Sequence, residues 1–245
     1  SLTPDVVGKT TVTITINNKT FQVNINTLGV DVPNSLLLST KQKKQITVKG
    51  INGIKWNSSN SSVVSVSKNG TIYAKKTGNA VLIGTLGDLQ LGCAVSVVTP
   101  ARKRTVQKAI QIAKTCTYSQ PKRMQEKFYD CSSLVWKSYH KNGVNFGMAY
   151  YAPVAADMGK WCVQHKKLVS GGLSRANIQN MKLNPGDVMF ETGQKNGRYK
   201  GIYHVEMITG YIFYGFDGNG KAELGIQWAT GDEKYYPMGQ MVGRP

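Results

Sequence analysis

A cysteine and a histidine are the two side chains of this sequence whose types and settings favour catalysis. Cys131 lies in Asp130-Cys-Ser-Ser-Leu-Val135, where Asp130 is a good N-cap and apolar residues follow at helical spacing. The thiol would then occupy the first turn of a helix, whose positive dipole end favours the nucleophilic thiolate. Buried free cysteines are common, so this position alone leaves a core role open.

A nucleophilic cysteine needs a base within hydrogen-bond reach, and the chain has three histidines. His140 follows Cys131 by nine residues in the same expected helix, which is about 13 Å along the axis and too far. His165 lies in a hydrophilic stretch. His204 lies in Tyr203-His-Val-Glu-Met-Ile208, whose alternation indicates a strand and therefore a rigid mount. We predict His204 as the base.

The base in turn needs a group that orients it. A strand over Glu223–Thr230 is expected to pair antiparallel with the His204 strand, and Gln227 lies on it between two apolar residues. We predict that the Gln227 amide accepts the imidazole N–H. A solvated strand position for Gln227 is the alternative.

The segments that must position these residues differ between the two halves of the chain. Alternating apolar residues and turn residues indicate short strands throughout residues 1–99, beginning with a hairpin over Thr11–Ile25. The further expected strands are Gln45–Val48, Ile54–Trp56, Val63–Val66, Thr71–Ala74, Ala80–Thr85 and Gly92–Val98. Many short strands with regular turns indicate a β-sandwich.

The pattern changes after Thr99-Pro100, where the apolar residues take the spacing of an amphipathic helix. We therefore predict two domains, 1–99 and 101–245. Helices are expected to about residue 170, followed by strands over Val188–Glu191, Tyr203–Tyr214 and Glu223–Thr230. Helices followed by an antiparallel sheet define an α+β domain.

The first half carries a family resemblance. The segments Ile54-Lys-Trp-Asn-Ser-Ser-Asn60, Val63-Val-Ser-Val-Ser-Lys-Asn-Gly70 and Thr77-Gly-Asn-Ala-Val81 occur in order, and together they resemble the bacterial Ig-like domain, group 2. The resemblance implies an all-β sandwich with Trp56 in its core. The first 30 or so residues resemble an extra hairpin, or the tail of a preceding repeat.

The second half resembles the NlpC/P60 cysteine peptidases over about residues 101–235. Three motifs in order carry the resemblance: the Asp130–Val135 segment, Asn184-Pro-Gly-Asp-Val-Met-Phe190, and His204-Val-Glu-Met-Ile-Thr-Gly210. It implies a papain-like α+β fold with helices packed on an antiparallel sheet. It also implies cleavage of amide bonds in peptidoglycan stem peptides, between D-glutamate and a diamino acid.

The same resemblance assigns roles to single residues. Cys131 matches the family's nucleophile, His204 its base and Gln227 its orienting residue, for which Asn219 or Glu206 could substitute. Three further residues match positions that bind substrate, two of them next to the nucleophile: Asp130, Ser132 and Tyr118. A helix-capping role for Asp130 is the alternative.

Composition bounds the setting of such an enzyme. The 31 basic and 13 acidic residues give a net charge of +18, shared by both halves, so the chain is attracted to polyanions. No run of 18 apolar residues predicts a transmembrane helix, and no signal peptide is visible. We expect a secreted, wall-associated monomer that binds stem peptides and anionic wall polymers and not nucleic acid, since no nucleic-acid-binding motif accompanies the charge.

The remaining cysteines predict neither a metal site nor a disulfide scaffold. No Cys-x-x-Cys or Cys/His cluster has zinc spacing, so no cofactor is expected. Cys93 is expected in the core, and Cys116 and Cys162 could form one disulfide. The alternative to a peptidase is a non-catalytic surface-interaction protein whose peptidase-like domain is inactive.

Overall fold

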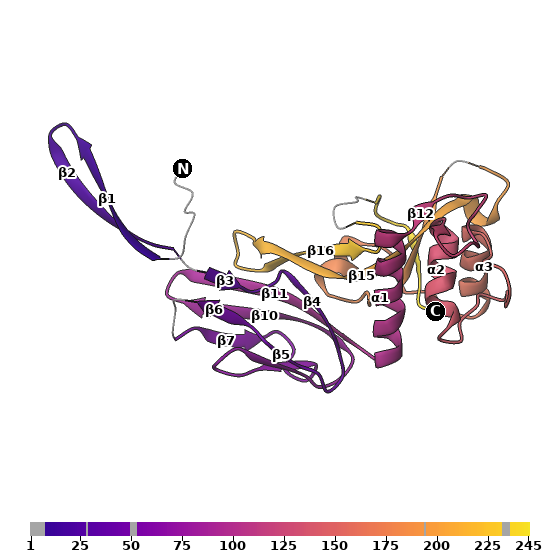
Figure 1. Cartoon of the computed structure of the whole chain (residues 1–245), viewed down its shortest axis with the longest axis horizontal. Coiled ribbons are helices and arrows are strands. Elements are labelled where there is room, and N and C mark those ends of the chain that lie inside the picture. Colours follow the sequence, from indigo (N-terminus) through magenta and orange to yellow (C-terminus); the bar gives the residue numbers. More distant parts are fainter. Residues whose placement is uncertain (1–7, 28, 50–52, 194, 232–235) are drawn as a thin grey trace.

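The computed structural model describes residues 8–27, 29–49, 53–193, 195–231 and 236–245. It opens with an antiparallel hairpin of β1 (Gly8–Ile16) and β2 (Lys19–Thr27), which projects away from the rest of the molecule (Figure 1). The turn is tight because Asn17 and Asn18 both take positive φ, as this kind of two-residue turn requires. A sandwich and then a helical region follow along the chain (Figure 1).

The sandwich is built from short strands in two layers. One sheet has the order β4 (Ser35–Ser39), β11 (Leu89–Val98), β10 (Gly78–Leu86) and β7 (Lys55–Ser58), with β4 parallel to β11. Facing strands are β5 (Lys43–Gln45), β9 (Thr71–Ala74) and β8 (Val64–Val66), and β3 (Gly29–Asp31) pairs with β6 (Thr47–Lys49). This Ig-like, all-β architecture confirms the fold predicted for the first half.

The sandwich core comes from alternate residues of these strands. Ile72, Leu82 and Val95 are fully buried there, because successive strand residues point to opposite faces. Trp56 is only partly buried and packs against this core from β7, so it borders the core that it was expected to fill. Its ring instead covers Gly84, where a Cβ would lie 2.9 Å from it.

The second half begins at Thr99, which caps α1 (Pro100–Thr115) by accepting a hydrogen bond from the Arg102 amide. Further helices are α2 (Cys131–His140), α3 (Ala155–Gln164) and α4 (Arg175–Gln179). An antiparallel sheet has the order β16 (Ala222–Trp228), β15 (Ile202–Phe216), β14 (Val188–Thr192) and β17 (Met241–Gly243). Two short strands, β12 (Thr117–Tyr118) and β13 (Phe128–Tyr129), precede α2.

The helices and this sheet share one core. Apolar side chains of α1, α2 and α3, among them Val106, Leu134 and Met158, pack with Phe190 and Val205 of the sheet. In Figure 1, α1 stands between the sandwich and the pair α2 and α3. No helix in the described part of the chain combines the length and apolar character that a membrane crossing needs.

The two halves are packed against each other through β11, β4 and β15. One apolar cluster joins Val81 and Ala94 of the sandwich to Tyr211 and Phe213 of the second half. The fit depends on Gly92, since a Cβ there would lie 2.2 Å from the Phe213 ring. The Ig-like domain is therefore a docked part of the molecule and not a loosely tethered spacer.

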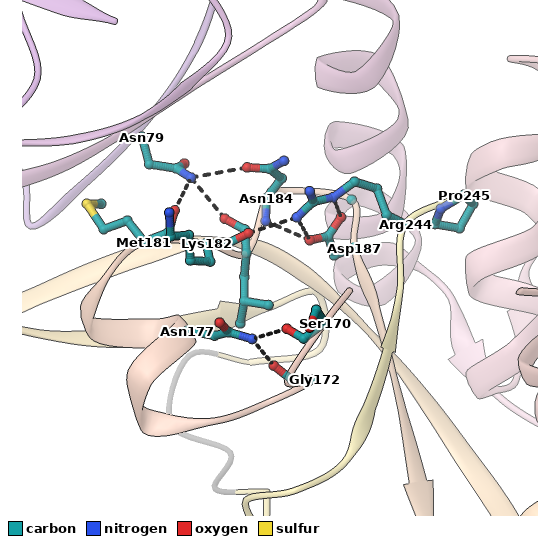
Figure 2. Close-up of polar contacts among 12 residues, drawn as sticks. Asn79, Ser170, Gly172, Asn177, Met181, Lys182, Asn184, Asp187, Arg244 and Pro245 are labelled. Atoms are coloured by element: carbon teal, nitrogen blue, oxygen red, sulfur yellow. Dashed lines mark hydrogen bonds and ion pairs between the residues drawn. The ribbon is translucent and has the colours of Figure 1, made fainter. Parts of the chain in front are cut away.

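Polar contacts at the same junction involve the Pro-Gly-Asp motif. Asn79 of β10 donates from Nδ2 to the carbonyls of Met181 and Leu183, at 3.0 and 2.9 Å (Figure 2). Asp187 is fully buried, and its carboxylate accepts two hydrogen bonds from the Arg244 guanidinium and one from the Asn184 backbone N–H (Figure 2). The motif thus fixes the junction and the C-terminal strand.

Candidate functional site

Cys131 is the first residue of α2, and the helix start is built by its neighbour. Asp130 accepts from the Ser133 amide at 2.7 Å, while the Ser133 hydroxyl accepts from the Asp130 amide at 2.8 Å. This reciprocal capping box satisfies two backbone donors at the helix start. It leaves the half-buried Cys131 at the positive end of the helix dipole.

The surroundings of the thiol act on its pKa in both directions. Burial raises the pKa of Cys131 above its ordinary value, and the Asp130 carboxylate adds to the rise. Backbone hydrogen bonds at Val205 and Ser132 and the Arg123 guanidinium lower the pKa. The balance favours the thiol in the resting protein, so a base must take its proton before it can attack.

His204 lies on β15 directly before Val205, whose backbone forms a hydrogen bond with the Cys131 thiol. Its Nε2 lies 3.9 Å from Glu206 Oε2 and 3.4 Å from the Tyr236 hydroxyl, and the Tyr236 ring stacks on the imidazole. The Cys131 thiol at the start of α2 therefore lies against the backbone of the residue that follows His204 on β15.

Glu206 is the buried carboxylate beside the imidazole of His204. It is only 2 % exposed, and its carboxylate accepts from the Thr230 hydroxyl at 2.8 Å and from the Met207 amide at 3.1 Å. Burial, followed by the charges of Glu206 and other acids, raises the pKa of Tyr236. The Tyr236 phenol therefore stays protonated beside the imidazole and the carboxylate.

Gln227 is not brought to His204. Strands β15 and β16 pair antiparallel as the sequence indicates, but Gln227 pairs with Gly210, six residues along β15 from His204 and therefore about 20 Å away. Its amide oxygen accepts instead from the Ser35 hydroxyl of the sandwich at 2.7 Å. Asn219 lies still farther along, in the turn between the two strands. Of the two substitutes considered for Gln227, Glu206 is the one that lies beside His204.

The residues flanking Cys131 are not open to a substrate. Asp130 and Ser132 are 4 % and 2 % exposed, and both are occupied by Arg123. The Arg123 Nε lies 3.2 Å from Asp130 Oδ2, and its Nη2 donates to Ser132 Oγ at 3.0 Å. A substrate group would have to displace this buried guanidinium, so the structure supports the capping role of Asp130 and not substrate binding by this pair.

Tyr118 lies beside the site and is accessible. It is 52 % exposed on β12, and its ring meets Tyr129 edge-on with the centroids 5.5 Å apart. Burial and the nearby Cys131 raise the pKa of its hydroxyl, while a hydrogen bond with the Cys131 backbone lowers it. Of the three predicted binding residues, Tyr118 is therefore the one that is both accessible and has its hydroxyl beside Cys131.

The other histidines stack on tryptophan rings, and two of the other cysteines lie in the protein core. His140 stacks on Trp136 and His165 stacks on Trp161, with ring centroids 4.1 and 4.3 Å apart. All four cysteines are free, so the Cys116–Cys162 disulfide is absent. Cys93 and Cys162 are fully buried, and burial raises the pKa of each from 9.0 to about 12. Among the described residues no group of three or more acidic, histidine or cysteine side chains could hold a metal.

Sequence reasoning missed Arg123 and Tyr236. Arg123 lies in a polar, lysine-rich stretch, and nothing in its spacing marks it as buried. Its Nη2 also donates to the carbonyls of Ala152 and Pro153, at 2.7 and 3.0 Å, so it ties the loop before α3 to the start of α2. That loop carries Tyr150, which is 96 % exposed.

The comparisons with known proteins concern the sandwich. Residues 32–97 match the bacterial Ig-like domain (group 2), which confirms the family predicted for this part of the chain. The match covers about a quarter of the sequence and does not extend to the site at Cys131. The resemblance of residues 101–235 to the NlpC/P60 peptidases therefore stays a prediction.

Solved structures similar to this chain share little sequence with it. They include a bacterial Ig-like domain containing GH10 xylanase from termite gut, with 22% identity and a TM-score of 0.25 over 26% of this chain and 18% of that one. Domains 4 and 5 of the S-layer protein SbsC have 18% identity and a TM-score of 0.24, over 40% of this chain and 62% of that one. An EHEC O157:H7 intimin mutant has 15% identity and a TM-score of 0.23, over 46% of this chain and 61% of that one. This chain thus spans less than two thirds of each, and no curated protein matches it.

Proposed function

We propose that this protein is a cysteine endopeptidase that cleaves amide bonds in the stem peptides of the bacterial cell wall. The observation that carries the proposal is the meeting of the α2 start with β15. The Cys131 thiol bonds to the backbone at Val205, next to His204, whose Nε2 faces Glu206 and Tyr236. A nucleophile, a base and a group that orients the base are the three parts that acyl transfer through a thiol needs.

The reaction would proceed in two steps. His204 takes the Cys131 proton, the sulfur attacks the scissile carbonyl, and a C–S bond forms as the C–N bond breaks. The imidazolium returns the proton to the leaving amine. Water then attacks the thioester with His204 as base, which releases the carboxylate and restores the thiol. Backbone N–H groups at the start of α2 would stabilise the oxyanion.

The setting of the substrate follows from charge and domain content. A net charge of +18 favours retention on the anionic polymers of a cell wall. Residues 32–97 belong to a bacterial Ig-like domain, group 2, a module that fits an extracellular or surface-associated protein. Cleavage between D-glutamate and a diamino acid rests on the NlpC/P60 resemblance alone.

The decisive experiment is digestion of purified peptidoglycan and defined muropeptides by the wild-type chain and by Cys131→Ala. New free amines that require Cys131 support the proposal, and mass spectrometry of the products identifies the bond. Cys93→Ala is the matched control, since Cys93 is buried in the core of the sandwich and not in the core against which Cys131 packs. We expect this control to retain turnover.

A second comparison separates the peptidase from a surface-interaction protein. Sedimentation of both proteins with insoluble peptidoglycan measures binding without turnover. Equal binding by wild type and Cys131→Ala, with no product from either on any muropeptide, would contradict the peptidase proposal and support the non-catalytic alternative.

A further inference from the structure

The hairpin of β1 and β2 presents an uncovered apolar face. Along each strand the apolar residues alternate with polar ones, and Val12 pairs with Val23 while Ile14 pairs with Phe21. Ile14, Phe21 and Val23 are 42 %, 52 % and 44 % exposed. A two-stranded hairpin by itself is at best marginally stable in water, and an apolar face of this kind marks an interaction surface.

A hairpin of the same pairing register occurs a second time in the chain, 70 positions later, with Gly78 in the place of Gly8. Strands β1 and β10 both have nine residues and begin with glycine, and both are followed by a two-residue turn. The pairing register is also the same, since Gly8 pairs with Thr27 and Gly78 pairs with Val97. The first hairpin therefore repeats the last hairpin of the Ig-like sandwich.

The two faces of the hairpins correspond as well. Val12 and Val23 occupy the positions of Leu82 and Cys93, which are fully buried in the sandwich core. The first hairpin thus has apolar residues on the face that the core covers in the second. Its other face is polar, with threonine, glutamine and asparagine side chains.

The sandwich of this chain does not supply the missing cover. The segment that covers the equivalent face of β10 and β11 lies between residues 32 and 77 and is already packed there. The first hairpin stands away from it (Figure 1). Its apolar face therefore needs a different occupant with the same shape and chemistry.

We propose that β1 and β2 are the closing hairpin of another Ig-like domain, whose earlier strands precede them in the natural protein. The occupant of the apolar face is thus an Ig-like half-sandwich that lacks only its last hairpin. The chain described here then holds the end of one Ig-like repeat, which passes directly into a second one.

Two cysteine substitutions on adjacent residues test this proposal. Val23→Cys places a thiol on the apolar face, and Gln22→Cys, the matched control, places one on the polar face. Each is introduced into the natural protein isolated from its own cells and into the 1–245 chain. Alkylation is followed by peptide mass spectrometry, which separates these thiols from the native cysteines.

The expected result is slow alkylation of Val23→Cys in the natural protein, by about 100-fold relative to Gln22→Cys, because burial restricts access to local opening. In the 1–245 chain the two thiols should react at similar rates. Hydrogen exchange of residues 8–27 in the unsubstituted proteins gives the same comparison without a mutation, and slower exchange in the natural protein is expected.

Two results would overturn the proposal. Equal alkylation of both thiols in the natural protein, with hydrogen exchange of residues 8–27 as fast as in the 1–245 chain, would show that nothing covers the face. Protection of Val23→Cys in the 1–245 chain, with a dimer in light scattering, would show that the occupant is a second copy.

Discussion

Replacing Arg123 with methionine is the sharpest test of how the start of α2 is held. The Arg123 guanidinium pairs with Asp130 at 3.2 Å and donates to Ser132 and to the carbonyls of Ala152 and Pro153. The two charged side chains are 10 % and 6 % exposed, so water screens the pair only weakly. Methionine has a similar length but removes the charge and every donor.

The expected loss of stability follows from the buried charge that remains. Removing one partner of a buried ion pair costs about 3–5 kcal/mol, because the other charge is left without compensation. For a chain of this size that corresponds to a fall in Tm of about 10 °C. Lys122→Met is the matched control, since Lys122 is an exposed neighbour, and it should change stability by less than about 0.5 kcal/mol.

A double-mutant cycle with Asp130→Asn isolates the pair. Asparagine is as good an N-cap as aspartate, so this variant removes the charge and keeps the cap. Urea unfolding of the two single variants and the double variant should give a coupling energy of about 1–3 kcal/mol, with the double variant more stable than additivity predicts.

Two results would refute this role of Arg123: melting of Arg123→Met within 2 °C of wild type in calorimetry, or additivity of the two substitutions. Either result would mean that Arg123 is solvated in solution and does not hold Asp130. Asp130 and Ser132 would then again be available to bind a substrate group.

Three further predictions concern the base, a buried thiol and the domain junction. Glu206→Gln should lower kcat by about 10- to 100-fold with little change in KM, whereas Gln227→Ala should leave kcat unchanged; equal losses in muropeptide assays would reverse this assignment. Because burial raises the pKa of Cys162, the thiol contributes stability that is fully present below pH 9 and is lost as pH rises from 9.0 toward about 12. Over this range the free energy of unfolding, measured with urea, should fall less steeply with pH in Cys162→Ala than in wild type. Gly92→Ala should lower Tm, because its Cβ would clash with an aromatic ring across the junction, whereas Gly218→Ala has open space; equal melting of the two variants would contradict the packing described.

The local pattern of the chain predicted most elements of the sandwich. Thr71–Ala74 forms β9 with the bounds expected, and the strands expected over Ala80–Thr85 and Gly92–Val98 lie within β10 and β11. Alternation and turn residues act over a few positions, so they can be read without knowing what packs on them. The parallel pairing of β4 with β11 joins distant segments and has no local signal.

The candidate site divides in the same way. Cys131 could be singled out because a helix cap is a local feature, and His204 because it lies on an alternating strand with few competitors. Gln227 was misplaced because β15 and β16 are joined by the turn at Asp217–Lys221, and antiparallel pairing counted from that turn places Gln227 opposite Gly210 and not opposite His204. Arg123 could not be found, because its burial depends on carbonyls 29 and 30 residues away.

The sequence alone predicted the Ig-like sandwich, the change of fold near Thr99 and the two residues proposed for the chemistry. Helix caps, alternation and turns depend on neighbours in the chain, so they can be recognised without the fold. Only the tertiary structure decided that Glu206 and Tyr236 lie beside His204, that Arg123 pairs with Asp130, and that the two halves are packed together. These outcomes depend on which distant groups share a buried site, where an unpaired charge or polar group is too costly to remain.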